Sequence, residues 1–136
     1  MSEKHAGPTD ASFTTGMDIR RDMFGPAGAE GRYAQTNDFN RPFEEVVTRY
    51  CFGDTWSRPG LDRKTRSLIT LAALTAMVRP NQLRIHVRGA LANGATPEEI
   101  REVLLHTVVY AGVPAGVEAF TAAAEVLKDL SQPPGD

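Results

Sequence analysis

Residues 96–112, TPEEIREVLLHTVVYAG, decide the fold class. Thr96 supplies an N-cap hydroxyl, Pro97 suits the first helical position, and Glu99 stands three residues after the cap, where its carboxylate completes a capping box. Apolar residues then recur at helical spacing, and Gly112 readily adopts the left-handed conformation that closes helices. The stretch therefore predicts an amphipathic helix over 97–111.

The segments before it carry the same kind of signal. Pro80 can open a helix that Asn93 and Gly94 end, and we expect this helix and the next to form a helical hairpin. Asp62 can cap a helix of about sixteen residues, whose wide apolar arc predicts a central position in the fold.

Three more helices complete the pattern, over 17–24, over 42–52 and from Pro114 onward. No segment shows the sustained alternation of a half-buried strand. The sequence thus predicts an all-α fold, a compact single domain of about six helices. The polar ends, 1–14 and 131–136, are expected to be disordered tails around a helical domain at 15–130.

Composition limits the function. Fifteen Lys and Arg against 17 Asp and Glu give a net charge of −2, which argues against a nucleic-acid partner. Cys51 is the single cysteine, which excludes an internal disulfide, a CxxC redox pair and a cysteine-rich zinc site. There is neither an apolar run of about 18 residues nor a signal-type N-terminus, so we expect no membrane contact and a cytoplasmic location.

Two histidines fall on predicted helices. His86 lies on an apolar stripe, where a buried imidazole can titrate near neutrality and transfer protons; the alternative is a core histidine satisfied by a carbonyl or amide. Gln82, one turn earlier, can orient the ring or bind a ligand. His106 follows Glu102 by one turn and is interpreted as a partly exposed, carboxylate-paired residue. Without HxH, HExxH or a cysteine cluster, no metal site is predicted.

Two loops can line a pocket. Trp56 and Arg58 lie in the segment WSRPGL, where the ring can form a wall and the guanidinium can bind a carboxylate; the alternative is a hydrophobic plug beside a solvated arginine. Tyr110 and Gly112 belong to the corner YAGVPA, which brings backbone amides and a helix N-terminus to one place, a ready anion site. A plain interhelical turn is the alternative there.

Residues 39–127 resemble the carboxymuconolactone decarboxylase family, specifically its 4-carboxymuconolactone decarboxylase type. The resemblance is carried by the patterns WxRPGLDRxTRSL, HVRGALxNGxTxEEIxEVL and YxGVPA in combination, and weaker similarity extends back to GMDIRRDMFG. Relatives with peroxidase activity carry CxxC just before the helix histidine. Here the corresponding residues are RPNQ at 79–82, so disulfide-based hydroperoxide reduction is excluded.

The resemblance implies an alkyl hydroperoxidase D-like helical domain in a ring-like homo-oligomer, commonly a hexamer built as a trimer of dimers. It also implies that the partner is a small dicarboxylate lactone. In the protocatechuate branch of the β-ketoadipate pathway, 4-carboxymuconolactone loses carbon dioxide to give 4-oxoadipate enol-lactone, and no cofactor is required. On this basis His86 is the expected catalytic residue, and the expected substrate-binding residues are Arg58, Trp56, Gln82, Tyr110 and Gly112.

Two positions depart from the family pattern. Typical members have glutamate where this chain has Gln82, and a histidine in a GxxHV segment where this chain reads GPAGA at 25–29, with Gly28 at the position of the histidine. These departures leave two alternatives open. One is a paralogue that isomerises or decarboxylates a different unsaturated lactone or keto acid, and the other is a non-catalytic oligomer that binds an anionic metabolite.

Overall fold

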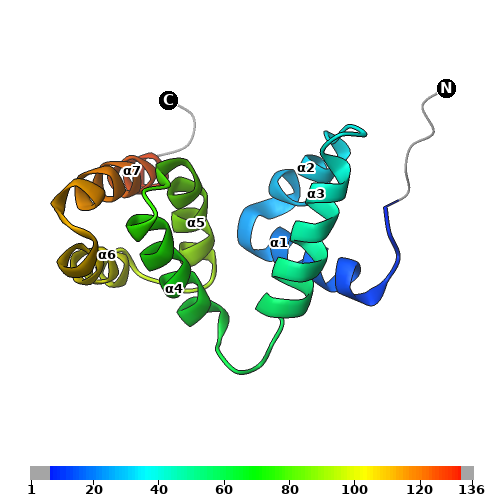
Figure 1. Ribbon diagram of the computed structural model, residues 1–136, viewed down its shortest axis with the longest axis horizontal. Helices are drawn as coiled ribbons and strands as arrows, with labels where there is room; N and C mark the ends of the chain where they lie inside the picture. The colour runs from blue at the N-terminus through cyan, green and yellow to red at the C-terminus, as the bar shows by residue number, and fades with distance from the viewer. Residues whose placement is uncertain (1–6, 133–136) are drawn as a thin grey trace. The chain divides into compact units, whose positions relative to one another are not determined.

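The computed structural model describes residues 7–132, and over that range it contains helices and loops but no strand. Seven α-helices and one π-helix form two compact units, which divide between Gly60 and Leu61 (Figure 1). The all-α class is confirmed. The count of seven α-helices corrects the predicted six, because a five-residue helix, α2 (Glu30–Ala34), forms without a side-chain cap that could have announced it.

The first unit also contains α1 (Ala11–Gly28), α3 (Arg41–Val46) and the π-helix η1 (Val47–Trp56). α3 and η1 follow each other without a break, so the helix predicted over 42–52 is confirmed and extends to Trp56. α1 begins before the predicted domain boundary at 15, because the Asp10 carboxylate caps it by accepting a hydrogen bond from the Phe13 amide at 3.2 Å. Residues 1–6 and 133–136 of the predicted tails lie outside the described residues.

Two glycines allow α1 and η1 to cross backbone to backbone. A Cβ atom added to Gly16 would lie 1.9 Å from the Thr48 carbonyl oxygen, and one added to Gly53 would lie 2.1 Å from the Ser12 carbonyl oxygen. No other residue type fits at either position without moving the helices apart. The crossing packs η1 residues such as Phe52 against the apolar face of α1.

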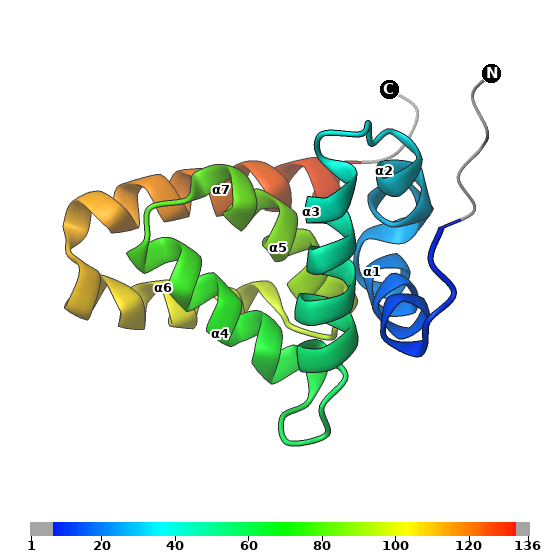
Figure 2. The same cartoon turned by 45° about the vertical axis from the view of Figure 1, so that its right-hand side comes forward.

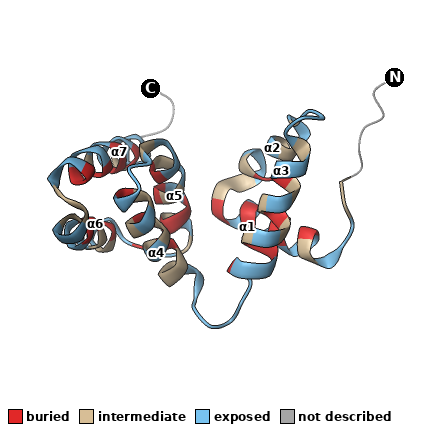
Figure 3. Ribbon diagram, viewed as in Figure 1, coloured by how far each residue is buried: buried red, intermediate tan, exposed pale blue. Residues whose placement is uncertain are grey.

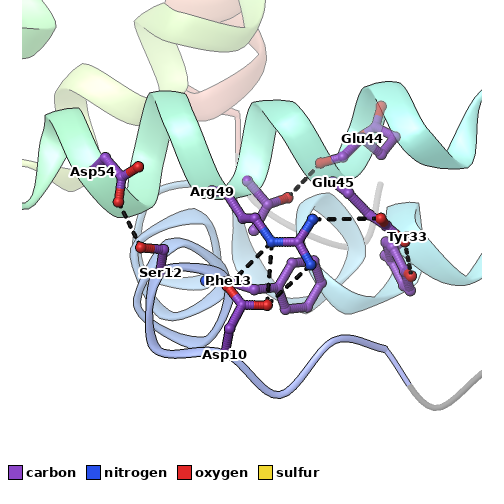
Figure 4. Close-up of polar contacts among 9 residues, drawn as sticks. Asp10, Ser12, Phe13, Tyr33, Glu44, Glu45, Arg49 and Asp54 are labelled. Atoms are coloured by element: carbon purple, nitrogen blue, oxygen red, sulfur yellow. Dashed lines mark hydrogen bonds and ion pairs between the residues drawn. The ribbon is translucent and has the colours of Figure 1, made fainter.

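Arg49 links the start of α1 to η1 on the surface of the first unit (Figure 4). Its guanidinium donates hydrogen bonds to the Asp10 carboxylate at 3.0–3.2 Å and lies 3.5 Å from a Glu45 oxygen. The Tyr33 hydroxyl donates to Glu45 at 3.0 Å. Each of these exposed pairs contributes little to stability. Together they pair the charges of Arg49, Asp10 and Glu45.

The second unit contains α4 (Arg63–Ala76), α5 (Pro80–Ala92), α6 (Pro97–Ala111) and α7 (Val113–Ser131). The predicted starts at Pro80 and Pro97 are confirmed, and so is the capping box, in which Thr96 and Glu99 exchange hydrogen bonds of 3.0 and 3.1 Å. α4 packs against the other three helices, which confirms its predicted central position (Figure 2). None of the helices in the described range is long and apolar enough to cross a membrane.

The predicted hairpin of α5 and α6 is wrong. α5 packs on α4 and α7, and α6 packs on the same two helices, so α5 and α6 are not packing neighbours. The reason is that the apolar faces of α5 and α6 both turn toward α4 and α7. The core that results is built around Leu71, Leu83, Val87, Ile100 and Leu104, each at most 1% exposed, and Figure 3 marks the buried positions in red.

Candidate functional site

His86 lies in the middle of α5, one residue before Val87, which is fully buried. The imidazole is half-buried, and its Nδ1 atom is out of contact with solvent. Burial lowers the pKa of His86 from its ordinary value of 6.5 to about 4. The prediction that this ring titrates near neutrality is therefore wrong, because burial removes water from around the charged form of the ring.

A neutral imidazole has a defined chemical capacity at pH 7. It carries one N–H donor and one acceptor nitrogen, so it can donate a hydrogen bond to a developing oxyanion or accept one from a bound acid. It does not hold the additional proton of an imidazolium.

Gln82 precedes His86 by four residues on α5, which places both on one face of the helix. The Gln82 side chain is exposed. The substitution of an amide for a carboxylate at this position agrees with the low pKa of the imidazole, because a glutamate one turn away would favour the charged ring.

Tyr110 and Gly112 lie at the corner between α6 and α7. Gly112 adopts φ 98° and ψ 159° between the two helices, a conformation that favours glycine, and its amide donates to the Val108 carbonyl at 2.9 Å. Tyr110 is 81% exposed, and its ring centroid lies 5.4 Å from that of His106. The corner therefore presents an exposed aromatic surface beside the N-terminus of α7.

Trp56 and Arg58 belong to the first unit, whereas His86, Gln82, Tyr110 and Gly112 belong to the second. The Trp56 ring is 8% exposed and stacks at a tilt on Phe52, with centroids 5.8 Å apart. Arg58 is exposed in the loop that follows η1, and its amide donates to the Thr55 carbonyl at 3.1 Å. Trp56 thus anchors this loop in the core of the first unit. The six residues are divided between two units.

A cavity and a groove lie within the second unit. A cavity of about 260 Å³ between α6 and α7 is lined mainly by apolar side chains, including Ile100, Leu104 and Phe120, with Glu98 and Arg101 among its polar residues. A groove of about 370 Å³ between α4 and α6 is lined by Leu68, Ile69, Ala72 and Val103, with Glu102 and His106. We call it the α4–α6 groove. His86 lines neither of them, and the sequence patterns predicted neither.

A buried charge cluster in the first unit also escaped prediction. Glu44 is 6% exposed and accepts hydrogen bonds from Arg20, itself 4% exposed, at 3.0 Å and from Arg32 at 2.9 Å. Burial alone would raise the pKa of Glu44, but the hydrogen bonds and charges of the two arginines outweigh it and lower the pKa. The cluster links α1 and α2 to α3 through hydrogen bonds to Glu44. Nothing in the local periodicity marks an arginine as a core residue.

Other reactive groups are few. Among the described residues, no group of three His, Cys, Asp or Glu side chains is placed to hold a metal ion. Burial raises the pKa of the Cys51 thiol, which keeps it protonated and a poor nucleophile at neutral pH.

The chain belongs to the carboxymuconolactone decarboxylase family, whose model matches residues 41–125. It is 41% identical to the 4-carboxymuconolactone decarboxylase of Acinetobacter baylyi over 122 residues, which cover 90% of this chain and 91% of that protein. It is also 39% identical, over 87% of this chain and 82% of the relative, to a nitrosuccinic acid decarboxylase of Metarhizium robertsii. An uncharacterized 15.0 kDa protein of Paracoccus denitrificans is 46% identical over 55% of this chain and 58% of its own length. Two of these three relatives are decarboxylases by name.

Proposed function

We propose that this chain is a carboxy-lyase that converts 4-carboxymuconolactone, or a close analogue, to 4-oxoadipate enol-lactone without a cofactor. The observation that carries the proposal is the 41% identity with a 4-carboxymuconolactone decarboxylase along nine-tenths of both chains. A step in the protocatechuate branch of aromatic degradation, a cytoplasmic location and an alkyl hydroperoxidase D-like fold are parts of the same proposal.

The substrate supplies its own electron sink. The departing carboxylate is attached γ to an unsaturated lactone carbonyl. When the C–C bond breaks, its electron pair passes into the conjugated system as a dienolate, with negative charge on the lactone oxygen. A proton then adds to a ring carbon. The protein must hold two carboxylates and stabilise charge on that oxygen.

His86 is the residue that we assign to the lactone oxygen. A neutral, half-buried imidazole donates a hydrogen bond whose strength grows as the oxygen becomes negative, and it requires no charged group to be buried beforehand. Arg58 is assigned to a substrate carboxylate, with Trp56 anchoring its loop. Gln82, Tyr110 and Gly112 remain predicted contacts with the substrate.

The test uses the purified full chain and freshly generated 4-carboxymuconolactone, with carbon dioxide release and the ultraviolet change followed in one sample. We expect one mole of carbon dioxide for each mole of lactone whose conversion the ultraviolet change reports. His86→Ala is expected to lower kcat roughly 10²- to 10³-fold, the usual cost of one lost oxyanion donor. His86→Gln should retain part of the rate, because an amide can donate a hydrogen bond. Arg58→Ala should raise KM through the lost carboxylate contact.

The matched control is Arg88→Ala, which alters an exposed α5 residue that lies 3.8 Å from Asp129 across the helix pair. It should leave turnover unchanged. Wild-type rates in both His86 variants would refute the assigned role. An ultraviolet change without carbon dioxide would indicate an isomerase, and thermal stabilisation by the lactone without turnover would indicate a binding protein.

A second substrate class has an observation in its favour, namely the 39% identity with a nitrosuccinic acid decarboxylase. A nitro group α to the departing carboxylate also accepts an electron pair, so the same hydrogen-bond donor can serve either reaction. Assaying nitrosuccinic acid beside the lactone, at equal concentrations, decides between them by the ratio of kcat/KM values.

We also propose that the protein is a homo-oligomer, with a hexamer built as a trimer of dimers as the expected form. Large apolar side chains on both units support this, because Phe39 is 94% exposed, Tyr110 81% and Val109 77%. Exposed apolar groups in such number are typical of surfaces that a partner covers.

A further inference from the structure

A side-chain hydrogen bond joins α5 to α4 within the second unit. The Asn93 amide nitrogen Nδ2 donates to the Ser67 hydroxyl oxygen at 3.0 Å. Asn93 is half-buried and follows the last residue of α5 as its C-cap, whereas Ser67 lies on α4 and is fully buried. We call this contact the Asn93–Ser67 hydrogen bond. It connects two helices through residues that lie 26 positions apart in the chain.

The end of α5 does not require the Asn93 side chain. The Asn93 backbone amide donates to the Gly89 carbonyl at 3.0 Å, and Gly94 adopts φ 97°, a left-handed conformation that is common where helices end. The Ala95 amide then donates to the Ala90 carbonyl at 2.9 Å. Backbone hydrogen bonds therefore close the helix, and the Asn93 side chain reaches across to α4 instead.

Ser67 also differs from the other two buried hydroxyl residues of the second unit. The Thr75 hydroxyl donates to the Leu71 carbonyl at 2.7 Å, and the Thr107 hydroxyl donates to the Val103 carbonyl at 2.7 Å. Each of these bonds lies within one helix, where a hydroxyl contacts the carbonyl four residues earlier. The Ser67 hydroxyl instead accepts a hydrogen bond from a different helix.

His86 and Asn93 lie on the same face of α5. Seven residues separate them, which is close to two helical turns and about 10 Å along the helix axis. The side chain that is bonded to α4 therefore points in nearly the same direction as the imidazole. The buried residues of α5 all have apolar side chains or none: Leu83, Val87, Gly89 and Ala90. Apolar packing is non-directional, whereas a hydrogen bond requires a narrow range of distance and angle, so the Asn93–Ser67 hydrogen bond constrains the rotation of α5.

A small rotation of α5 would displace the imidazole of His86. Side chains extend about 6 Å from the axis of a helix, so a rotation of about 10° moves such a ring by about 1 Å. A displacement of about 1 Å at a reacting group can lower a rate about 10²-fold. The hydrogen bond thus acts on a scale that matters for a group that must meet a developing charge.

We propose that Asn93 and Ser67 are positioning residues, whose hydrogen bond fixes the rotation of α5 and thereby holds the His86 imidazole in place for the lactone oxygen. The inference rests on the proposed function, in which His86 donates a hydrogen bond to that oxygen. Neither positioning residue touches the substrate in this account. Their loss should therefore lower kcat and leave KM unchanged.

The experiment compares steady-state kinetics of the full chain and its variants with 4-carboxymuconolactone, below the melting temperature of each variant. Ser67→Ala removes the acceptor, and Asn93→Leu removes the donor at nearly the same side-chain size. Each should lower kcat about 10- to 100-fold with KM within about twofold of the wild type. The double variant should be no slower than the slower single variant, because the two groups act as one.

Two further variants separate positioning from a general loss of stability. Asn93→Asp should retain most of kcat, because a carboxylate can accept a hydrogen bond from the Ser67 hydroxyl and so restore the contact in the opposite direction. Thr75→Val is the matched control, since it removes a buried α4 hydroxyl that bonds its own helix. It should leave kcat unchanged. Circular dichroism should show wild-type helix content in every variant, and if Ser67→Ala does not fold, the contrast between Asn93→Leu and Asn93→Asp decides.

The outcomes distinguish this inference from the function on which it rests. A wild-type chain that releases no carbon dioxide from the lactone refutes both. If the wild type turns over and His86→Ala is slow, three results refute only the positioning role. These are wild-type kcat in Ser67→Ala and Asn93→Leu, a double variant whose loss is the product of the single losses, and a loss in Thr75→Val as large as theirs.

Discussion

The pH dependence of stability tests the state of His86 directly. Its pKa is about 4 in the folded protein, against an ordinary value of 6.5 that the unfolded chain restores. Between these values the unfolded state binds the proton and the folded state does not, so the free energy of unfolding must fall as pH falls through this window. One pKa unit corresponds to about 1.36 kcal/mol, and acidification from pH 7 to pH 5 should therefore cost about 2 kcal/mol.

The assay is urea unfolding followed by circular dichroism at pH 7, 6 and 5, at one protein concentration. His86→Gln removes the titrating group and should abolish most of the loss between pH 7 and pH 5, whatever it does to stability at pH 7. The matched control is His106→Gln, which replaces an exposed histidine and should retain the wild-type dependence. Carboxyls such as Glu44 and Glu99, whose pKa values are lowered, lose their contribution only at more acidic pH.

An equal slope in the wild type and in His86→Gln would refute the reasoning, since it would mean that the ring gains its proton without penalty in the folded state. Proton nuclear magnetic resonance of the ring gives an independent measurement. The resonances of His86 should report the neutral form at pH 5.5, well below the ordinary histidine range.

Two further predictions concern the first unit. Glu44→Gln leaves the Arg20 charge buried without its carboxylate and should cost about 3–5 kcal/mol in urea unfolding, whereas Glu125→Gln breaks an exposed pair of similar length, 2.9 Å, and should cost less than about 1 kcal/mol. Gly16→Ala places a Cβ 1.9 Å from a carbonyl oxygen of η1 and should lower the melting temperature by several degrees, a loss of at least about 2 kcal/mol, whereas Gly60→Ala meets no atom within 4 Å and should be tolerated. Unchanged melting in Gly16→Ala would contradict the backbone crossing.

Local signals located most of the helices. The caps at Asp62 and Thr96 and the prolines at 80 and 97 lie where helices begin, and the capping box forms as expected. Such signals succeed because the hydrogen bonds they describe join residues three or four positions apart. α2 was missed for the same reason, since neither a capping side chain nor an apolar period marks it.

Local signals did not determine which helices pack together. Adjacency in the chain suggested a hairpin of α5 and α6, yet both helices pack on α4 and α7. Apolar periodicity shows which face of a helix is buried, but it does not show which other helix covers that face. The choice of partner depends on the apolar faces of all four helices of the second unit together.

What the sequence determined by itself was the all-α class, the positions of the main helices and membership of the family, since caps, periodicity and motifs are properties of neighbouring residues. What only the tertiary structure decided was the environment of each group: the buried Arg20–Glu44 pair, the crossing at Gly16, and the neutral imidazole of His86. Burial and electrostatics depend on residues brought together from distant parts of the chain, and a proton on an imidazole responds to that surrounding rather than to its place in a motif.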